Sequence, residues 1–186
     1  MDHEQRRREI VEALWRVARG EGLAAVTLRR VAAEAGVSMN LVQYYFTTKD
    51  QLIQDGLHLL IEAAGARLGR ELAKATNPRD AVRRCLTGLL PLDERSRLYS
   101  AVFHAYLGFA VTQPAIAALV KRIPHDVVAT LAPVLAKANL DEREMHGLLA
   151  MADGLASGIL VGTYSGREAL ELVDHRVSVL FGTLES

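Results

Sequence analysis

"GLAAVTLRRVAAEAGVSMNLVQYYFTTKDQL" forms residues 22–52 and contains two short helical patterns joined by a glycine. Thr27 is placed to cap a helix whose apolar residues recur at spacings of three and four. Gly36 can end that helix in a left-handed conformation, and Ser38 can cap a second helix that runs to about residue 45 or 46. Two short helices with a glycine-containing turn are typical of a helix-turn-helix, whose second helix can enter a DNA major groove. Spacing alone does not separate this motif from helical hairpins that never bind DNA.

A helical wheel divides the second of these helices into an inner and an outer side. At 100° per residue, Val42 and Phe46 fall together and are predicted to face the core. The outer side carries two amides, one phenol and one aliphatic chain: Asn40, Leu41, Gln43 and Tyr44, with Tyr45 at its margin. Asparagine and glutamine pair with adenine, and an aliphatic chain can touch a thymine methyl group, so this side is suited to base edges.

Groups suited to phosphate surround this face. They are the Thr27 hydroxyl and the amides that follow it, Arg29, the hydroxyls of Tyr44 and Tyr45, Lys49, and Arg6, Arg7 and Arg8. Residues 1–50 hold eight basic and seven acidic side chains, so a positive field must come from their arrangement. We expect Glu12, Glu21 and Glu34 to lie away from the DNA.

Composition predicts a helical protein for the remaining chain. Half of the 186 residues are hydrophobic, and alanine and leucine outnumber the residues that strands favour. Thr48 and Gln51 form a possible capping box for a helix over about 48–75. Further helices are predicted at 78–89, 93–112, 114–138, 142–163 and 167–184, with Pro124 dividing or kinking the third of these five.

Several classes of protein are excluded or disfavoured. The single cysteine, Cys85, excludes an internal disulfide and a cysteine-based zinc site, and no metal or cofactor is expected. Lysine and arginine total 22 against 22 acids, so any attraction to nucleic acid is local. The start "MDHEQRRREI" lacks the features of a secretory signal, which predicts a cytoplasmic protein. The weakly charged stretch 147–164 contains six Gly, Ser or Thr residues and is not expected to span a membrane.

Residues 22–52 resemble the N-terminal signature of the TetR-type one-component transcriptional regulators. The shared features are Thr, an apolar residue and Arg, then "VAAEAGVS", an aromatic-rich recognition helix, Phe46, and Lys49 before an apolar residue. The segments "MADGLASGILVG" and "REALELVDHRVSVLF" are more loosely similar to the last two helices of many members. Members often carry Tyr at position 43 and His at position 45, so Gln43 and Tyr45 depart from the pattern.

The resemblance implies an all-α fold with two domains. An N-terminal three-helix DNA-binding domain, residues 1–48, would precede a larger helical ligand-binding and dimerisation domain, residues 49–186. The resemblance also implies a homodimer on a palindromic operator, usually a repressor that a small molecule releases. The predicted DNA-binding residues are Thr27, Arg29, Ser38, Asn40, Leu41, Gln43, Tyr44, Tyr45 and Lys49; Arg29, Asn40, Leu41 and Gln43 would reach bases.

Two apolar patterns in the C-terminal half suggest a dimer interface. Gly154, Gly158 and Gly162 recur every fourth residue, which lets another helix approach closely. The next helix has a seam at Leu170, Val173, Val177, Leu180 and Leu184. Together they could form half of a four-helix interface, although packing within one chain would give the same patterns.

A ligand pocket is predicted around "RLYSAVFHAYLGF", residues 97–109. Aromatic residues with a few polar groups line many small-molecule sites, but an aromatic stripe is also common in a plain core. The candidate pocket residues are Tyr99, Phe103, His104, Tyr106 and Asp153.

Two other functions stay open at this point. An enzyme is disfavoured because HExxH, GxSxG and phosphate-loop motifs and a Cys/His cluster are absent from the sequence, and the six histidines are scattered. A DNA-binding protein that senses no ligand, such as an activator or an architectural protein, is the other alternative.

Overall fold

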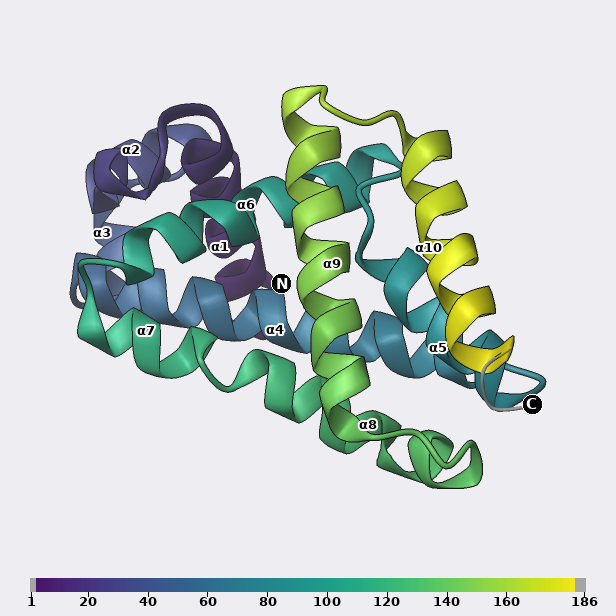
Figure 1. Cartoon of the computed structure of the whole chain (residues 1–186). Helices are drawn as coiled ribbons and strands as arrows, with labels where there is room; N and C mark the ends of the chain where they lie inside the picture. Colours follow the sequence, from purple (N-terminus) through teal and green to yellow (C-terminus); the bar gives the residue numbers. More distant parts are fainter. Residues whose placement is uncertain (1–2, 183–186) are drawn as a thin grey trace. The chain divides into compact units, whose positions relative to one another are not determined.

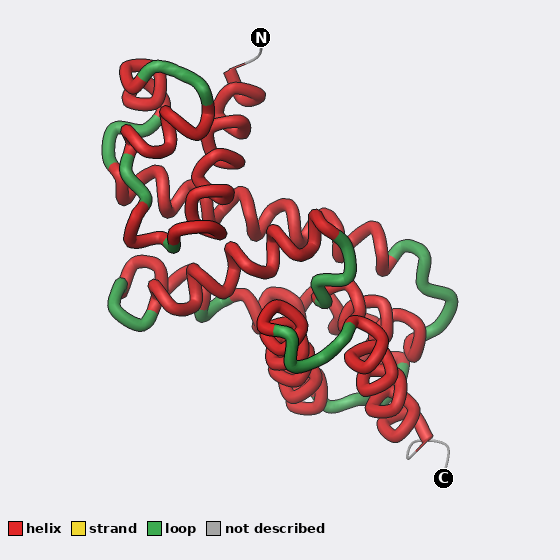
Figure 2. Tube along the Cα trace, turned by 90° about the horizontal axis from the view of Figure 1, so that it is seen from above, coloured by secondary structure: helices red, strands yellow, loops and turns green. Residues whose placement is uncertain are grey.

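The computed structural model describes residues 3–182, and this part of the chain is helical with connecting loops and no strand (Figure 2). The predicted all-α class is therefore confirmed. In chain order (Figure 1) the elements are α1 (His3–Glu21), the 3₁₀ turn η1 (Leu23–Ala25), α2 (Leu28–Ala35), α3 (Met39–Tyr45), α4 (Lys49–Leu72), α5 (Pro78–Leu89), α6 (Glu94–Ala110), α7 (Pro114–Val120), α8 (Ile123–Lys137), α9 (Glu142–Val161) and α10 (Gly166–Gly182). Within residues 3–182, no helix has both the length and the apolar character needed to cross a membrane.

The caps predicted around α2 and α3 are present. The Thr27 hydroxyl accepts a hydrogen bond from the Arg30 amide at 3.0 Å, and the Ser38 hydroxyl accepts one from the Leu41 amide at 3.2 Å. Gly36 has φ 66°, the left-handed conformation in which glycine avoids the strain of a side chain. These local bonds fix where each helix of the helix-turn-helix begins and ends.

The start of α4 differs from the prediction in one detail. Thr48 accepts a bond from the Gln51 amide at 3.1 Å, as expected of a cap. The Gln51 side chain instead accepts from the amide of Thr47, one residue before the cap, at 2.9 Å. Further along the chain, α7 ends at Val120 and α8 begins at Ile123, so the helix around Pro124 is divided as predicted.

One compact unit consists of residues 1–63 and 101–120. Its core is built around α1, which packs against α2 and η1. The Trp15 indole donates to the Gly56 carbonyl at 3.1 Å, and the Tyr106 hydroxyl donates to the Ile53 carbonyl at 2.8 Å, both in buried surroundings. A Cβ atom at Gly56 would lie 2.6 Å from the Tyr106 hydroxyl oxygen, so this glycine permits the close approach of α6 to α4.

The other compact unit consists of residues 64–100 and 121–186. Here α5 packs against α8, α9 and α10, and α9 also contacts α8 and α10. Their apolar side chains form one core that includes Leu86, Leu131, Met145, Ala152 and Val173. Both α4 and α6 contribute residues to each unit, because these long helices carry apolar residues along most of their length. The predicted boundary after residue 48 marks the end of the helix-turn-helix, and as a functional boundary it stays a prediction.

Candidate DNA-binding surface

Helix α3 presents the two sides that the wheel predicted. Val42 and Phe46 are 0% exposed, whereas Tyr44 is 73% exposed. Asn40 and Gln43 are also exposed, and Leu41 and Tyr45 are partly buried. The apolar side holds α3 in its unit, so two amides and a phenol are left to face the solvent.

The residues at the start of α2 belong to the same helix-turn-helix, since α2 packs against both α1 and α3. Arg29 is exposed and takes part in no ion pair within residues 3–182. The Thr27 and Ser38 hydroxyl oxygens accept cap bonds, which leaves each O–H proton available to donate to a phosphate oxygen. These two residues therefore have a structural role in addition to the predicted contact.

Lys49 begins α4, and its ammonium donates to the Ala24 carbonyl at 3.1 Å. This bond joins α4 to η1, a contact that linear spacing did not indicate. An ammonium has three protons, so Lys49 keeps donors for a phosphate. A substitution at Lys49 would consequently remove a structural bond as well as a charge.

Two of the three acids that were expected to lie away from DNA form ion pairs with arginines. Glu34 forms ion pairs with Arg16 at 2.9 Å and Arg30 at 3.1 Å, and Glu21 pairs with Arg30 at 2.7 Å. Hydrogen bonds from Arg16 and then Arg30 lower the pKa of the Glu34 carboxyl, and bonds to Glu21 and then Glu34 raise the pKa of Arg30. Both carboxylates are thus neutralised locally. Glu12 is exposed, and its place relative to DNA stays a prediction.

Two of the three N-terminal arginines already have partners. Arg6 pairs with Glu9 at 2.6 Å, and Arg7 pairs with Asp55 of α4 at 2.8 Å. The Arg7 guanidinium also lies 5.6 Å from the centre of the Phe46 ring, so it connects α1 with α4 and the end of α3. Arg8 is exposed and takes part in no ion pair in the described part of the chain, which leaves it suited to a phosphate.

His3 is a neighbour of the recognition helix that the sequence pattern did not indicate. Its ring centre lies 4.5 Å from that of Tyr45 and 6.1 Å from that of Tyr44. A single histidine at the start of a helix carries no local signal for such a contact. Only the folding of α1 against α3 brings these rings together.

The described residues of the predicted dimer seam on α10 pack within their own unit. Val173, Val177 and Leu180 are buried in the core of their own unit, and Leu170 packs against that core. Their spacing of three and four is used within the chain because α10 packs on α5 and α9. Leu184 lies outside the described residues.

The three predicted interface glycines of α9 have different surroundings. Gly154 is exposed, with open space where a Cβ atom would lie. Gly158 is buried beneath Tyr164, since a Cβ atom there would lie 2.5 Å from the ring. Gly162 ends α9 with φ 83°. Of the three, only Gly154 offers a helix surface to a partner.

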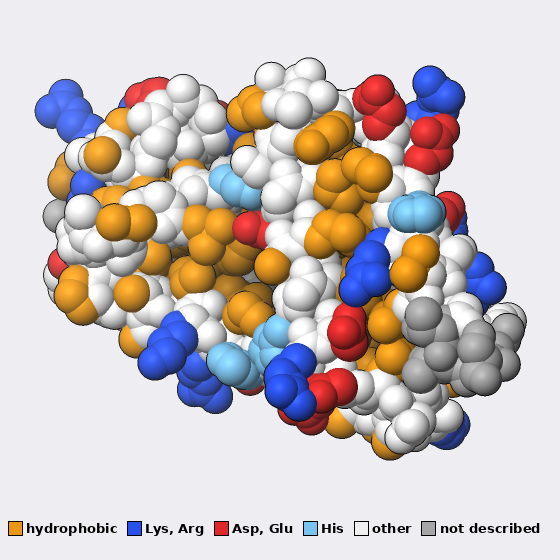
Figure 3. Space-filling model, viewed as in Figure 1, with side chains coloured by type: hydrophobic (Ala, Val, Ile, Leu, Met, Phe, Trp, Pro, Cys, Tyr) orange, Lys and Arg blue, Asp and Glu red, His pale blue; other side chains and the backbone are white. Residues whose placement is uncertain are grey.

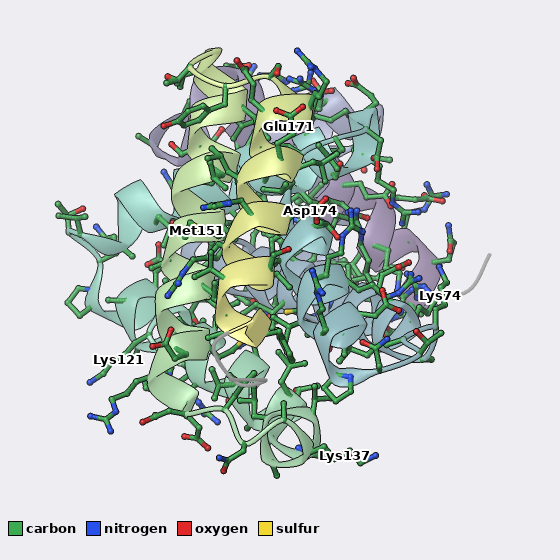
Figure 4. The ribbon with its side chains drawn as sticks, turned by 45° about the vertical axis from the view of Figure 1, so that its right-hand side comes forward. Lys74, Lys121, Lys137, Met151, Glu171 and Asp174 are labelled. Carbon is green, nitrogen blue, oxygen red and sulfur yellow. The ribbon has the colours of Figure 1, made fainter. Side chains whose placement is uncertain are left out.

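Another apolar surface of α9 and α10 remains exposed. On α10, Leu172 and Val179 are 42% and 41% exposed, and on α9 Val161 is 76% exposed. Figure 4 shows the two helices side by side, with Met151 on α9 and Glu171 and Asp174 on α10. Hydrophobic side chains are also visible between α9 and α10 in Figure 3. We name the following set the outer seam: Gly147, Ala150, Gly154, Ser157, Val161, Leu172, His175 and Val179.

The candidate pocket residues are divided between the two units. Phe103, His104 and Tyr106 lie in the first, and Tyr99 and Asp153 lie in the second. Tyr106 is 0% exposed and its hydroxyl is bonded to the Ile53 carbonyl, so it serves the core of its unit. No group of three or more His, Cys, Asp or Glu side chains suited to a metal ion occurs within residues 3–182.

Tyr99 has a cationic neighbour on its own helix. The Arg95 guanidinium lies 5.4 Å from the centre of the Tyr99 ring, and its Nε donates to the Tyr99 hydroxyl at 3.1 Å. One face of this ring is therefore already in contact with a positive charge. Phe103 has no such neighbour recorded in the described chain; its ring lies edge-on to His104, with ring centres 6.1 Å apart.

Two family models match this chain. Residues 10–55 match the N-terminal model of the bacterial regulatory proteins of the tetR family, and residues 78–182 match the C-terminal model of the BetI-type transcriptional repressors. The second match covers more than half of the chain. The chain belongs to the TetR family of transcriptional regulators and carries a BetI-type C-terminal region.

Individual relatives agree with this assignment. The HTH-type transcriptional regulator BetI of Paraburkholderia phymatum is 28% identical over 184 residues, 95% of this chain and 93% of the relative. The regulator PksA of Bacillus subtilis is 31% identical over 110 residues, 59% of this chain, and the match spans 54% of PksA.

Solved structures share the fold. A transcriptional regulator from Rhodococcus sp. Rha1 has a TM-score of 0.81 at 29% identity, covering 96% of this chain and 95% of that protein. A regulator from Saccharomonospora viridis, solved in complex with choline, has a TM-score of 0.84 at 22% identity, covering 95% and 97%. The fold and the helix-turn-helix surface thus define a DNA-binding transcriptional regulator.

Proposed function

We propose that this protein is a repressor that binds a palindromic operator as a homodimer and is released by a small molecule. The observation that carries the proposal is the outer side of α3, where Asn40, Gln43 and Tyr44 are exposed while Val42 and Phe46 are fully buried. In this role, α3 enters the major groove, and the amides of Asn40 and Gln43 pair with base edges. Leu41 contacts a thymine methyl group.

The remaining predicted residues position the helix on the duplex. Arg29 is an exposed guanidinium at the start of α2, suited to a base edge or a phosphate. Four residues have donors for phosphate oxygens: Tyr44, Tyr45, Thr27 and Lys49. Such phosphate contacts fix the register of the helix on the duplex without reading its base sequence. Two copies of α3 in one dimer would occupy successive major grooves, about 34 Å apart along the duplex.

Selection of bound duplexes from a random DNA library tests this function. The expected product is a palindrome with half-sites one helical turn apart. On that operator, Gln43→Ala should cost about 1–3 kcal/mol and relax preference at one base pair. Tyr44→Phe removes one phosphate donor and should weaken binding to all sequences alike. Enrichment of no sequence, or equal effects of Gln43→Ala on specific and nonspecific DNA, would contradict the assignment.

The outer seam supports the proposal of a homodimer. Its positions on α9 recur at spacings of three and four and are exposed except for the partly buried Ser157. Most are small, which suits close packing against a second helix. Leu172→Glu would place a charge in that interface, so the variant should sediment as a monomer. Val111→Glu is the matched control, because Val111 is 85% exposed and lies in the other unit. A dimeric Leu172→Glu variant would exclude this surface.

For the effector, the proposal is a small organic cation of the choline type. Support comes from the Saccharomonospora viridis regulator, which was solved in complex with choline. An aromatic face such as Phe103 attracts quaternary ammonium groups. His104 lies beside it in the same unit, with ring centres 6.1 Å apart.

A thermal-shift comparison tests the effector proposal, since a ligand that binds only the native state raises Tm. Choline should raise Tm and weaken operator binding, whereas 3,3-dimethyl-1-butanol, its neutral isostere, should do neither. Phe103→Leu removes the aromatic face and should abolish the response to choline. An equal response to the isostere would show that the site does not select a cation.

A further inference from the structure

Three aromatic rings from two helices form one cluster beside the base-reading face. The His3 ring, at the start of α1, lies 4.5 Å from Tyr45 with the planes at 45°, and 6.1 Å from Tyr44 with the planes at 72°. Tyr44 and Tyr45 meet edge to face at 5.2 Å. His3 and Tyr44 are exposed and Tyr45 is partly so. The imidazole of α1 therefore extends the outward surface of α3.

The neighbours of this ring are uncharged on α3 and charged on α1. Helix α3, which packs against it, has no charged side chain. On α1 the nearest charged residues are Glu4, its neighbour in sequence, and Arg6 and Arg7 in the next turn, which pair with Glu9 and with Asp55 of α4. Within residues 3–182, His3 itself takes part in no ion pair.

We propose that His3 is a further DNA-contacting residue, and that its imidazole becomes protonated and binds a backbone phosphate when the recognition helix is seated. This inference rests on the proposed DNA binding. Histidine is the side chain whose unperturbed pKa, about 6.5, lies nearest neutral pH. A phosphate within contact distance favours the charged form of an imidazole, so association should take up a proton at this position.

The sign of the effect follows from linkage. A group whose pKa is higher in the complex binds protons on association, so operator affinity increases as pH falls through the range between the two pKa values. The contribution is fully present below the pKa of the free protein and is lost above that of the complex. Each proton taken up on association changes operator affinity by at most about tenfold per pH unit.

The test is the operator dissociation constant of the full chain from pH 6 to 8 at fixed ionic strength. Wild type should bind more tightly as pH falls, by roughly tenfold or more between pH 8 and pH 6 for the two His3 residues of a dimer. His3→Gln removes the titration and keeps a polar side chain, while His3→Phe keeps the ring contact with the tyrosines. Both variants should lose most of the pH dependence, and His3→Phe should also retain the melting temperature of wild type. The five other histidines remain in these variants and serve as an internal control.

The outcomes separate this inference from the proposed function. Specific operator binding that does not change with pH, or a His3→Gln variant with the slope of wild type, would overturn the role of His3 and leave the repressor intact. Binding to no DNA at any pH would overturn both. A direct readout is the His3 pKa by NMR with and without operator: an increase on binding supports the proposal, and an unchanged pKa refutes it.

Discussion

Gly56 is the position where a single methyl group should have the clearest effect on stability. A Cβ atom there would lie 2.6 Å from the Tyr106 hydroxyl oxygen and 3.0 Å from Leu14 Cδ2. Ordinary contact begins at 3.4 Å, so α6 and α4 would have to separate by about 0.8 Å. That movement would stretch the 2.8 Å bond from Tyr106 to the Ile53 carbonyl beyond hydrogen-bonding distance.

The expected magnitude combines three effects. Overpacking a core costs about 1–3 kcal/mol, and loss of one buried hydrogen bond adds about 1 kcal/mol. Alanine in place of glycine within a helix raises the free energy of unfolding by about 1 kcal/mol through its higher helix propensity. Gly56→Ala should therefore lower the free energy of unfolding by about 1–3 kcal/mol. Gly65→Ala is the control in the same helix: Gly65 is exposed with open space at its Cβ position, so this change should stabilise by up to about 1 kcal/mol.

Urea unfolding at fixed protein concentration would measure both changes, and a double variant makes the test sharper. Tyr106→Phe removes the atom that obstructs the new methyl group. Alone, Tyr106→Phe should lower the free energy of unfolding by about 1 kcal/mol. In the Gly56→Ala background it should leave this free energy unchanged or raise it. The reasoning is refuted if Tyr106→Phe has the same effect in both backgrounds, or if Gly56→Ala stabilises as Gly65→Ala does.

Three further predictions follow from local contacts and burial. Ser38→Ala removes the cap on the Leu41 amide and should cost about 1 kcal/mol in urea unfolding, with weaker operator binding; an unchanged stability would argue against the cap. Burial raises the pKa of the Cys85 thiol to about 12, so alkylation at pH 8 should wait for unfolding, and rapid labelling of folded protein would contradict this. Hydrogen bonds from basic neighbours lower the pKa of Glu71 and of Asp80 below their ordinary values. Their contribution to stability is present above the unfolded pKa of about 4 and is lost as pH falls through the lower folded pKa. Tm should therefore decrease below about pH 4. A Tm that is constant from pH 5 to pH 3 would exclude this contribution.

The helix-turn-helix could be predicted because its signals act over a few residues. The caps at Thr27 and Ser38 each bond an amide three residues ahead, and Gly36 adopts its conformation without any distant partner. The wheel of α3 was correct for Val42 and Phe46 because a helix with one apolar side has only one way to face a core. The DNA-binding roles of the outer residues stay predictions.

The C-terminal half was harder to predict because several partners satisfy the same pattern. A seam of spacing three and four on α10 suits a second subunit or a neighbouring helix equally well. The structure places Val173 and Val177 against residues such as Val82, about 90 positions earlier in the chain. Similarly, Tyr106 belonged to a stripe that fitted a pocket or a core, and its bond to the Ile53 carbonyl assigns it to the core.

The sequence by itself determined where most helices begin and end, which side of α3 is apolar, and which of its residues are left to face the solvent. These features depend on bonds within one or two helical turns, so the local order of residues specifies them. Only the tertiary structure decided that Val173, Val177 and Leu180 are buried in their own unit, that Gly56 must lack a side chain, and that His3 lies against Tyr44 and Tyr45. Those features depend on which elements, some 40 to 90 residues apart, pack against one another.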